Sequence, residues 1–285
     1  MSTPASPQPS PEPFGARLRR AMDIRGPLCV GIDPHAALLA AWGLDDDVAG
    51  LERFTRTVVD ALADRVAVLK PQSAFFERFG SRGVAVLERA IADARSAGAL
   101  VLADVKRGDI GSTMAAYAAA YLDPGSPLFS DAVTVSPYLG FGSLRPALDA
   151  ARAAGSGVFV LALTSNPEGA EVQRARTAGG ASVARTVLDH IARENAGAEP
   201  LGSVGAVVGA TLGRLDVDLA VNGPLLAPGL GAQGAGAEDL PVVFGDAVRN
   251  VVPSISRGIL GRGPSPEALR ESAARETERL VKVLG

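Results

Sequence analysis

The sequence contains little that would point to export or membrane insertion. Its one cysteine, Cys29, cannot form an intramolecular disulfide bond, and its apolar surroundings favour a small buried side chain over a reactive thiol. No apolar run approaches the ~18 residues that a membrane span requires, and the first residues lack the basic and apolar segments of a signal peptide. We therefore expect a cytoplasmic protein.

An excess of charge of one sign is also missing, because the formal net charge of the 285 residues is −3 and the calculated isoelectric point is near 5.5. Without an overall basic field the chain is a poor candidate for a nucleic-acid scaffold, although a local anion site is still allowed. Hydrophobic residues make up 47% of the sequence, which is enough for a large core. A small molecule is the expected partner.

The N-terminal segment, residues 1–13, is rich in proline and serine and nearly free of apolar side chains. It cannot bury enough surface to offset the entropy lost on ordering, so we interpret it as a disordered tail. In residues 14–25, Phe14, Leu18 and Met22 lie four apart, which predicts an amphipathic helix that closes one end of the core. Residues 14–285 are expected to form a single domain.

Eight short apolar runs follow, and the segments between them are long enough for helical crossovers. Strands that alternate with helices predict parallel pairing, and eight such units in about 230 residues have the size of an α/β protein of the (β/α)8 or TIM-barrel class. The alternative is a doubly wound open sheet, but the segment after the first run, GIDPHAALL, lacks the glycine-rich fingerprint usual there. The runs are 28–33, 66–72, 100–106, 132–137, 158–165, 204–210, 224–230 and 251–257.

Four connecting segments carry apolar residues at spacings of three to four, and several close on Gly or Asn, which is the pattern of amphipathic helices. In the last segment, Leu269, Leu280 and Val283 are expected to pack on the outside of the barrel. The four segments are 85–98, 143–154, 182–195 and 266–284.

The most informative stretch is LVLADVKRGDIGST, which begins as a strand buried on both faces and ends in charge. Asp104 and Lys106 lie two residues apart and point the same way on an extended backbone. After a turn, Asp109 stands near the start of a helix and Thr113 lies one turn further on. A structural ion pair and a helix cap would be the simpler explanation. Charges at the carboxyl end of a buried strand favour an active site, however, because their desolvation is costly.

Several other strands of such a barrel would end in polar residues at the same face, where barrel enzymes have their active sites. The guanidinium of Arg257 and backbone amides near Gly258 suit a phosphate group, and a glycine-rich loop that carries Gln233 suits a lid. The other candidates are Asp33, Lys70, Gln72, Thr164 and Ser165.

Some of these residues have a simpler explanation. Asp33 could serve only at a helix entry, Lys70 could reach to solvent, and Gln233 could be ordinary loop polarity. Ser136 is left outside the site as a plain cap or turn residue. His35 and His190 are expected to have structural or surface positions, not catalytic ones.

The motifs together resemble orotidine 5′-monophosphate decarboxylases, in particular the longer bacterial subgroup. The D-x-K-x-x-D signature appears as Asp104, Lys106 and Asp109, and the resemblance covers residues 14–284. It implies conversion of orotidine 5′-monophosphate to UMP in pyrimidine biosynthesis, with a carbanion at C6 stabilised by electrostatics and Lys106 as the candidate proton donor. The other motifs are LKPQSAFFE, LTSNPE, APGLGAQG and SISRGIL.

The resemblance also implies a role for each candidate. Lys70, Asp104, Lys106 and Asp109 would form an alternating charge network at the reacting carbon, without metal or cofactor. In a homodimer, Asp109 and Thr113 would reach into the partner's site. The implied substrate contacts are the ribose with Asp33 and Gln72, the pyrimidine with Thr164 or Ser165, and the phosphate with Gln233, Arg257 and Gly258.

Two other functions fit parts of the pattern. A sugar-phosphate lyase of the same wider barrel group would use Mg²⁺ and would need a further carboxylate, whereas the second run ends in Lys70 and Gln72. A catalytically silent phosphosugar-binding barrel would have to keep costly buried charge without using it. Activity that survives EDTA would separate the decarboxylase from the lyase.

Overall fold

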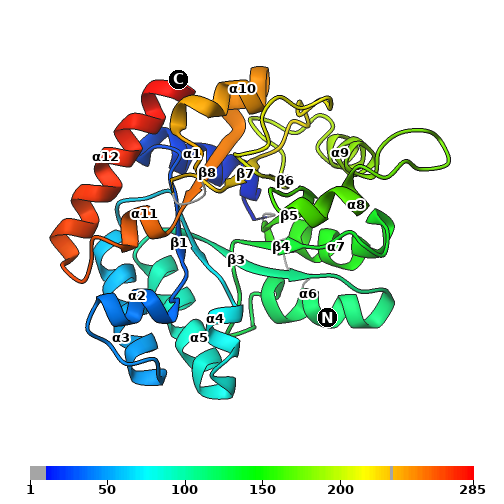
Figure 1. The fold of residues 1–285 in the computed structure, drawn as a ribbon. Helices are drawn as coiled ribbons and strands as arrows, with labels where there is room; N and C mark the ends of the chain where they lie inside the picture. The colour runs from blue at the N-terminus through cyan, green and yellow to red at the C-terminus, as the bar shows by residue number, and fades with distance from the viewer. Residues whose placement is uncertain (1–10, 232–233) are drawn as a thin grey trace, which may run out of the picture.

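The computed structural model describes residues 11–231 and 234–285. Eight parallel strands close into a barrel in sequence order, and β1 completes the ring by pairing with β8 (Figure 1). The predicted (β/α)8 barrel is confirmed, and the open-sheet alternative is wrong. The strands are β1 (Cys29–Ile32), β2 (Val68–Pro71), β3 (Leu100–Arg107), β4 (Ala132–Val135), β5 (Gly157–Leu163), β6 (Val204–Val208), β7 (Leu225–Pro228) and β8 (Val251–Ile255).

Helices surround the strands, and short 3₁₀ segments join several of them. Among the described residues, no helix is both long and apolar enough to cross a bilayer. The α-helices are α1 (Phe14–Arg25), α2 (Ala36–Ala41), α3 (Val48–Leu62), α4 (Ala74–Glu77), α5 (Gly80–Ser96), α6 (Gly111–Leu122), α7 (Arg145–Ala154), α8 (Ala170–Gln173), α9 (Val183–Glu194), α10 (Leu240–Phe244), α11 (Arg257–Leu260) and α12 (Pro266–Leu284). The 3₁₀ segments are η1 (Phe141–Leu144), η2 (Pro167–Gly169), η3 (Ala237–Asp239) and η4 (Gly245–Asn250).

The ends of several helices follow directly from their capping residues. The side chains of Asp47, Ser182 and Ser265 accept hydrogen bonds from backbone N–H groups in the first turns of α3, α9 and α12. Helix α5 begins at Gly80, five residues before the expected 85–98 segment. Its first turns contain Gly83, which packs so closely on α4 that a Cβ would lie 2.0 Å from a backbone oxygen of Phe76. Glycine lowers helix propensity, so the sequence did not predict the part of α5 that precedes residue 85.

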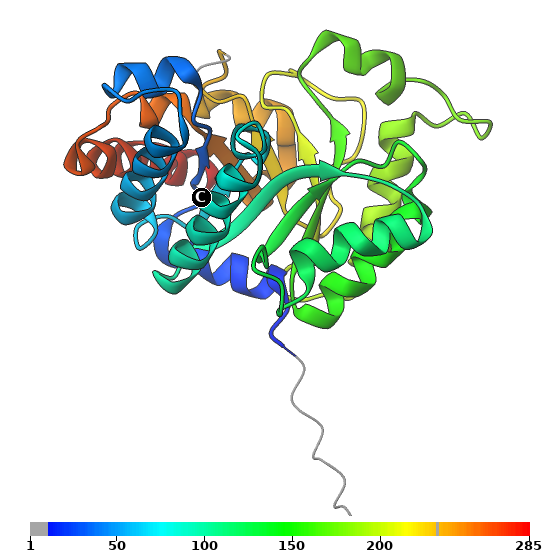
Figure 2. The ribbon, with the colours of Figure 1, turned by 90° about the horizontal axis from the view of Figure 1, so that it is seen from below.

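Helix α1 closes the amino-terminal end of the barrel, as its sequence predicts (Figure 2). Phe14 and Leu18 are fully buried, and the Phe14 ring meets that of Phe159 edge to face, with the centroids 6.0 Å apart. Burial of each such side chain contributes about 1.5–3 kcal/mol. Arg17 adds a hydrogen bond of 2.6 Å to the buried Asp131. The helix therefore seals the end opposite the candidate site.

The barrel interior begins with an apolar layer to which every strand contributes one residue, and α1 packs beneath it. Because side chains alternate along a strand, the residues two positions further on also point inward, at the carboxyl end. Four of them are polar, namely Lys70, Asp104, Thr134 and Ser254. The apolar layer consists of Cys29, Val68, Leu102, Ala132, Phe159, Val207, Leu226 and Val252.

Candidate active site

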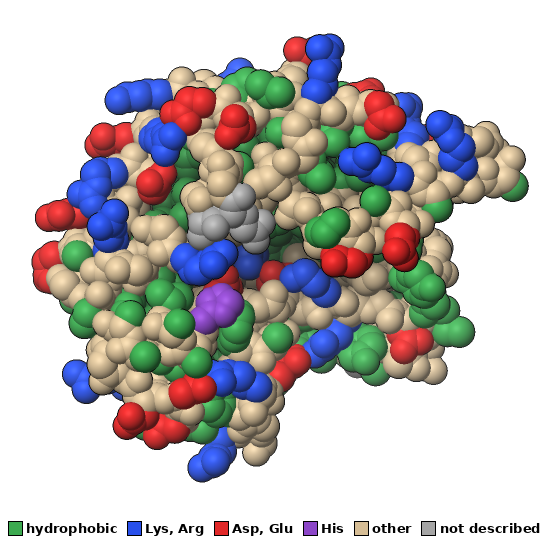
Figure 3. Space-filling model, viewed as in Figure 1, with side chains coloured by type: hydrophobic (Ala, Val, Ile, Leu, Met, Phe, Trp, Pro, Cys, Tyr) green, Lys and Arg blue, Asp and Glu red, His purple; other side chains and the backbone are tan. Residues whose placement is uncertain are grey.

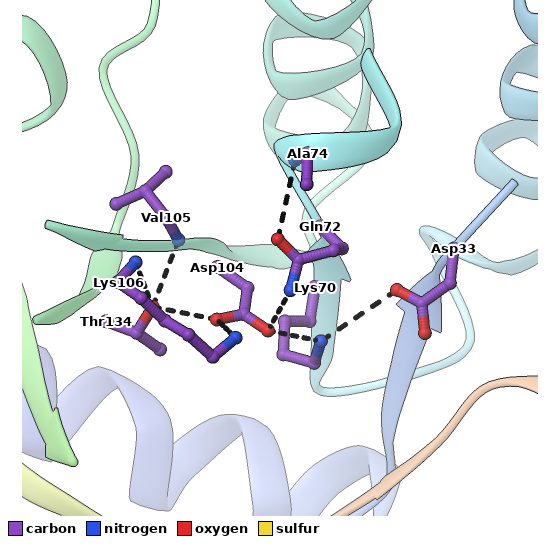
Figure 4. Close-up of polar contacts among 8 residues, drawn as sticks. All are labelled: Asp33, Lys70, Gln72, Ala74, Asp104, Val105, Lys106 and Thr134. Atoms are coloured by element: carbon purple, nitrogen blue, oxygen red, sulfur yellow. Dashed lines mark hydrogen bonds and ion pairs between the residues drawn. The ribbon is translucent and has the colours of Figure 1, made fainter. Parts of the chain in front are cut away.

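A buried carboxylate, that of Asp104, lies at the centre of the candidate site (Figure 4). Its Oδ2 accepts hydrogen bonds from Lys70 Nζ at 3.0 Å and from Gln72 Nε2 at 2.9 Å. Its Oδ1 accepts from Lys106 Nζ at 2.6 Å and from Thr134 Oγ1 at 2.8 Å. Four donors from three neighbouring strands or their ends therefore converge on one side chain.

The electrostatics of this cluster keep both Lys70 and Asp104 charged. Burial opposes the charged form of Lys70, but the carboxylates of Asp104 and Asp33 outweigh it and raise the pKa of Lys70 above its ordinary value. Burial likewise favours neutral Asp104, but Lys70, Lys106 and two side-chain hydrogen bonds hold the pKa of Asp104 well below its usual range. The site is thus a cluster of ions with little solvent around it. Desolvation of these charges costs free energy, so their presence here indicates a functional role.

Lys106 differs from Lys70 in its surroundings, because 46% of its side chain is exposed against 7% for Lys70. Its backbone has φ of 46°, in the left-handed region that non-glycine residues rarely adopt. Gly108 follows and packs against the loop after β4, where a Cβ would lie 2.4 Å from the backbone oxygen of Ser136. The ammonium of Lys106 therefore contacts Asp104 on one side and faces the open end of the barrel on the other.

Asp109 and Thr113 lie further out than the ion cluster. Asp109 Oδ1 accepts a hydrogen bond of 2.8 Å from the next residue's backbone N–H, and Thr113 is exposed on the first turn of α6. Within the described parts of one chain, no ion pair joins Asp109 to Lys70 or Lys106. The described residues of this chain therefore join Lys70, Asp104 and Lys106 by ion pairs and leave Asp109 outside the cluster.

The residues near the other strand ends surround the same opening. Asp33 lies after β1, and its Oδ1 is buried without a hydrogen bond, 4.0 Å from Lys70 Nζ. Thr164 Oγ1 donates to Asn166 Oδ1 at 2.6 Å and accepts from Gln173 Nε2 at 2.7 Å. Ser165 is exposed beside it, where Gly209 passes close to its backbone.

The candidate phosphate residues lie at the mouth of the barrel. Arg257 and Gly258 are exposed on the first turn of α11, directly after β8. Gln233 lies outside the described residues. On the face shown in Figure 3, Lys and Arg side chains gather around a central hollow together with a few acidic groups and one histidine. A phosphate group entering here would meet positive charge.

The cluster does not suit a divalent metal. Among the residues that the structure describes, no group of three or more His, Cys, Asp or Glu side chains could hold a metal ion. Both oxygens of Asp104 already contact ammonium groups, and the inward position on β2 carries Lys70 where a metal site would require a carboxylate. The residues therefore do not fit the Mg²⁺-dependent alternative.

The sequence-based choice of residues missed Thr134 and was right about Cys29. Thr134 lies in the fourth apolar run, two positions after the inward-facing Ala132, and this spacing was the signal that could have identified it. Cys29 is fully buried in the apolar layer, and burial raises the pKa of its thiol to about 12. It is a core side chain and not a reactive thiol.

A cavity of about 880 Å³ lies elsewhere, between α1 and α12 at the amino-terminal end of the barrel. Two of its arginines make structural contacts, since Arg25 donates to the carbonyl of Gly98 and Arg270 to that of Ala61. The polar residues that the sequence selected lie at the opposite end. We therefore assign the site to the carboxyl ends of the strands.

The fold and the cluster define a class of protein, a (β/α)8-barrel enzyme whose site combines buried opposite charges with an anion-attracting mouth. Residues 26–272 match the Orotidine 5'-phosphate decarboxylase / HUMPS family, and the chain belongs to this family. The resemblance found in the sequence motifs is thus confirmed, as is the expectation of an enzyme of the carboxy-lyase class.

Individual relatives match this chain over nearly its whole length. Curated proteins named orotidine 5'-phosphate decarboxylase are 73% identical in Streptomyces coelicolor and 72% in Salinispora arenicola, each over 93% of this chain and 95% of the relative. A crystal structure from Streptomyces avermitilis has a TM-score of 0.95 at 69% identity and covers 100% of this chain and 99% of its own. The Leishmania donovani OMP decarboxylase has a TM-score of 0.74 at 29% identity, over 95% of this chain and 99% of its own.

Proposed function

We propose that the chain removes CO₂ from orotidine 5′-monophosphate to give UMP in pyrimidine biosynthesis, with no metal or cofactor. The observation that carries this proposal is the Asp104 carboxylate, buried and bonded to both the Lys70 and Lys106 ammonium groups. The relatives in Streptomyces and Salinispora, named for this activity, support it. The unpaired, buried Cys29 agrees with the proposed cytoplasmic location.

Electrostatic stabilisation is the proposed source of catalysis. When the bond from C6 to the carboxylate breaks, the electron pair stays on C6, and this carbanion has little resonance stabilisation. A preorganised ammonium lowers the barrier, because it interacts with charge that develops only in the transition state. Lys106 Nζ is partly exposed at the open end and fixed by Asp104 at 2.6 Å. It then donates a proton to C6 and regains one from water.

Asp104 and Asp109 are proposed to fix the lysines and to place negative charge near the substrate carboxylate. The two aspartates would repel the carboxylate of the bound substrate, and this repulsion would be relieved as CO₂ leaves. It would therefore raise the free energy of the bound substrate relative to the transition state. The buried, strongly acidic Asp104 is suited to this, because it stays ionised at neutral pH.

The remaining candidates are proposed to bind the nucleotide. Asp33 carries a buried oxygen without a hydrogen bond, which suits a ribose hydroxyl, and the proposed second ribose contact, Gln72, is bonded to Asp104. Thr164 or Ser165 would contact the pyrimidine edge. The proposed phosphate ligands are Arg257, Gly258 and Gln233.

The proposed assembly is a homodimer that shares its sites. Ile110, next to Asp109, is 62% exposed, and Tyr138 and Leu139 in the loop after β4 are 77% and 51% exposed. The two loops lie side by side, since Ser136 N donates to the Arg107 carbonyl at 2.8 Å. A second copy covering this apolar edge would bring Asp109 and Thr113 to the partner's ion cluster.

The test follows the absorbance of orotidine 5′-monophosphate in the presence of EDTA, with the parent protein and Lys106→Ala. We expect the parent to convert the nucleotide and Lys106→Ala to lose decarboxylation while it still binds UMP. Lys282→Ala is the matched control, because Lys282 is exposed on α12 and far from the barrel mouth. Binding without turnover by the parent would indicate a silent barrel, and near-parental turnover by Lys106→Ala would remove that residue from its role.

A further inference from the structure

Thr134 on β4 has a side chain whose hydrogen-bonding capacity is filled completely (Figure 4). The residue is fully buried, and its Oγ1 donates to Asp104 Oδ1 at 2.8 Å. The same oxygen accepts from the backbone N–H groups of Val105 at 3.0 Å and Lys106 at 2.9 Å. A hydroxyl offers one proton and two acceptor positions, so all three are used and its orientation is fixed.

The strand pairing explains why a side chain is needed at this point. Ala103 pairs with Val133 and Arg107 pairs with Val135, so β3 advances four residues while β4 advances two. The extra residues of β3 form a bulge opposite Thr134, where the regular ladder cannot supply backbone acceptors. The Thr134 hydroxyl accepts from two consecutive N–H groups in place of those backbone acceptors, and the N–H of Val105 would otherwise be buried without a partner.

The bulge also contains the backbone strain of the site. Lys106 has φ of 46°, a left-handed conformation that is sterically unfavourable for a residue with a Cβ atom. The hydrogen bond that its backbone N–H donates to Thr134 Oγ1 holds Lys106 in this conformation, from which Nζ reaches Asp104 Oδ1 at 2.6 Å. One hydroxyl therefore fixes both the backbone of Lys106 and the carboxylate that its ammonium contacts.

We infer that Thr134 is a positioning residue for the reaction, acting through Lys106 and Asp104 and not by contact with the substrate. The inference rests on the proposed roles of those two residues. Lys106 and Asp104 are proposed to act at the reacting carbon and not at the ribose or phosphate. Loss of the Thr134 hydroxyl should therefore lower kcat and leave nucleotide binding nearly unchanged. A displacement of about 1 Å at a catalytic group can cost about 100-fold in rate.

The experiment compares Thr134→Val, which keeps the shape and removes the hydroxyl, with Thr134→Ser, which keeps the hydroxyl. We expect kcat to fall about 10- to 100-fold in Thr134→Val, with KM and the Kd for UMP changed less than about threefold, and to recover in Thr134→Ser. The matched control is Thr55→Val on α3. Thr55 is also fully buried, but its Oγ1 has no hydrogen-bond partner among the described residues, so kcat should stay parental.

Thr134→Cys is included in case Thr134→Val does not fold, since a thiol keeps the volume but bonds weakly. It is expected to lose kcat as the valine variant does. A folded Thr134→Val or Thr134→Cys with parental kcat would overturn the inference. Equal loss of kcat in Thr134→Ser would overturn it too, because the hydroxyl would then not be responsible. Failure of the parent to decarboxylate would instead overturn the proposed function.

Discussion

Replacement of Lys70 by methionine tests the ion cluster most directly, because it removes the buried ammonium and keeps most of the side-chain volume. Lys70 Nζ lies 3.0 Å from Asp104 Oδ2, and the two side chains are 7% and 8% exposed. Removing one partner of a buried pair costs about 3–5 kcal/mol, since the other charge stays buried. Asp104 keeps its donors Lys106, Gln72 and Thr134, so we expect a loss of about 3 kcal/mol, the lower end of this range.

The pH dependence of this loss has a definite sign. In the parent, the folded pKa of Asp104 is depressed, so its contribution is present above the unfolded pKa of about 3.9 and is lost as pH falls through the folded value. Without Lys70, burial is opposed less and the folded pKa of Asp104 rises. The difference in unfolding free energy between parent and variant should therefore be largest at pH 7 and become smaller toward pH 3.

At alkaline pH the group that titrates is Lys70, and the stabilisation is lost as pH rises. The folded pKa of Lys70 is raised, so its stabilisation is present below the unfolded pKa of about 10.4 and is lost as pH rises through the folded value. Urea unfolding followed by circular dichroism, at a fixed protomer concentration, measures the unfolding free energy at acid, neutral and alkaline pH. Lys282→Met is the control and should change stability by less than about 0.5 kcal/mol. A Lys70→Met protein as stable as the parent at pH 7 would refute the reasoning.

The barrel was predictable because its signals are local and repeated. Each strand is an apolar run, four of the connecting segments carry helical spacing, and the parallel order follows from the alternation of strands and helices. The apolar face of α1 was also visible, since Phe14, Leu18 and Met22 lie four apart and all three are buried. Boundaries were less certain where glycine has a packing role, as Gly83 does in α5.

The convergence of Lys70 and Asp104 was predictable for a different reason, namely that parallel strands in a closed barrel bring their carboxyl ends to one face. The role of Thr134 was not predictable. It depends on a bulge in β3 that changes the register with β4, and register is a property of two segments 30 residues apart. No local pattern in either segment records that Lys106 adopts a left-handed backbone.

Two further substitutions test the ends of the site. Arg257→Ala should lower kcat/KM by one to two orders of magnitude, the equivalent of a charge-assisted bond of about 1.5–3 kcal/mol, and should not affect turnover of orotidine, which lacks the phosphate. An unchanged kcat/KM would refute a phosphate role. For the shared site, Lys106→Ala and Asp109→Ala proteins are each expected to be inactive. Mixed one to one with subunit exchange, they should regain about a quarter of parental activity, because half of the dimers are hybrids with one intact site. No regain after verified exchange would mean that Asp109 acts within its own subunit.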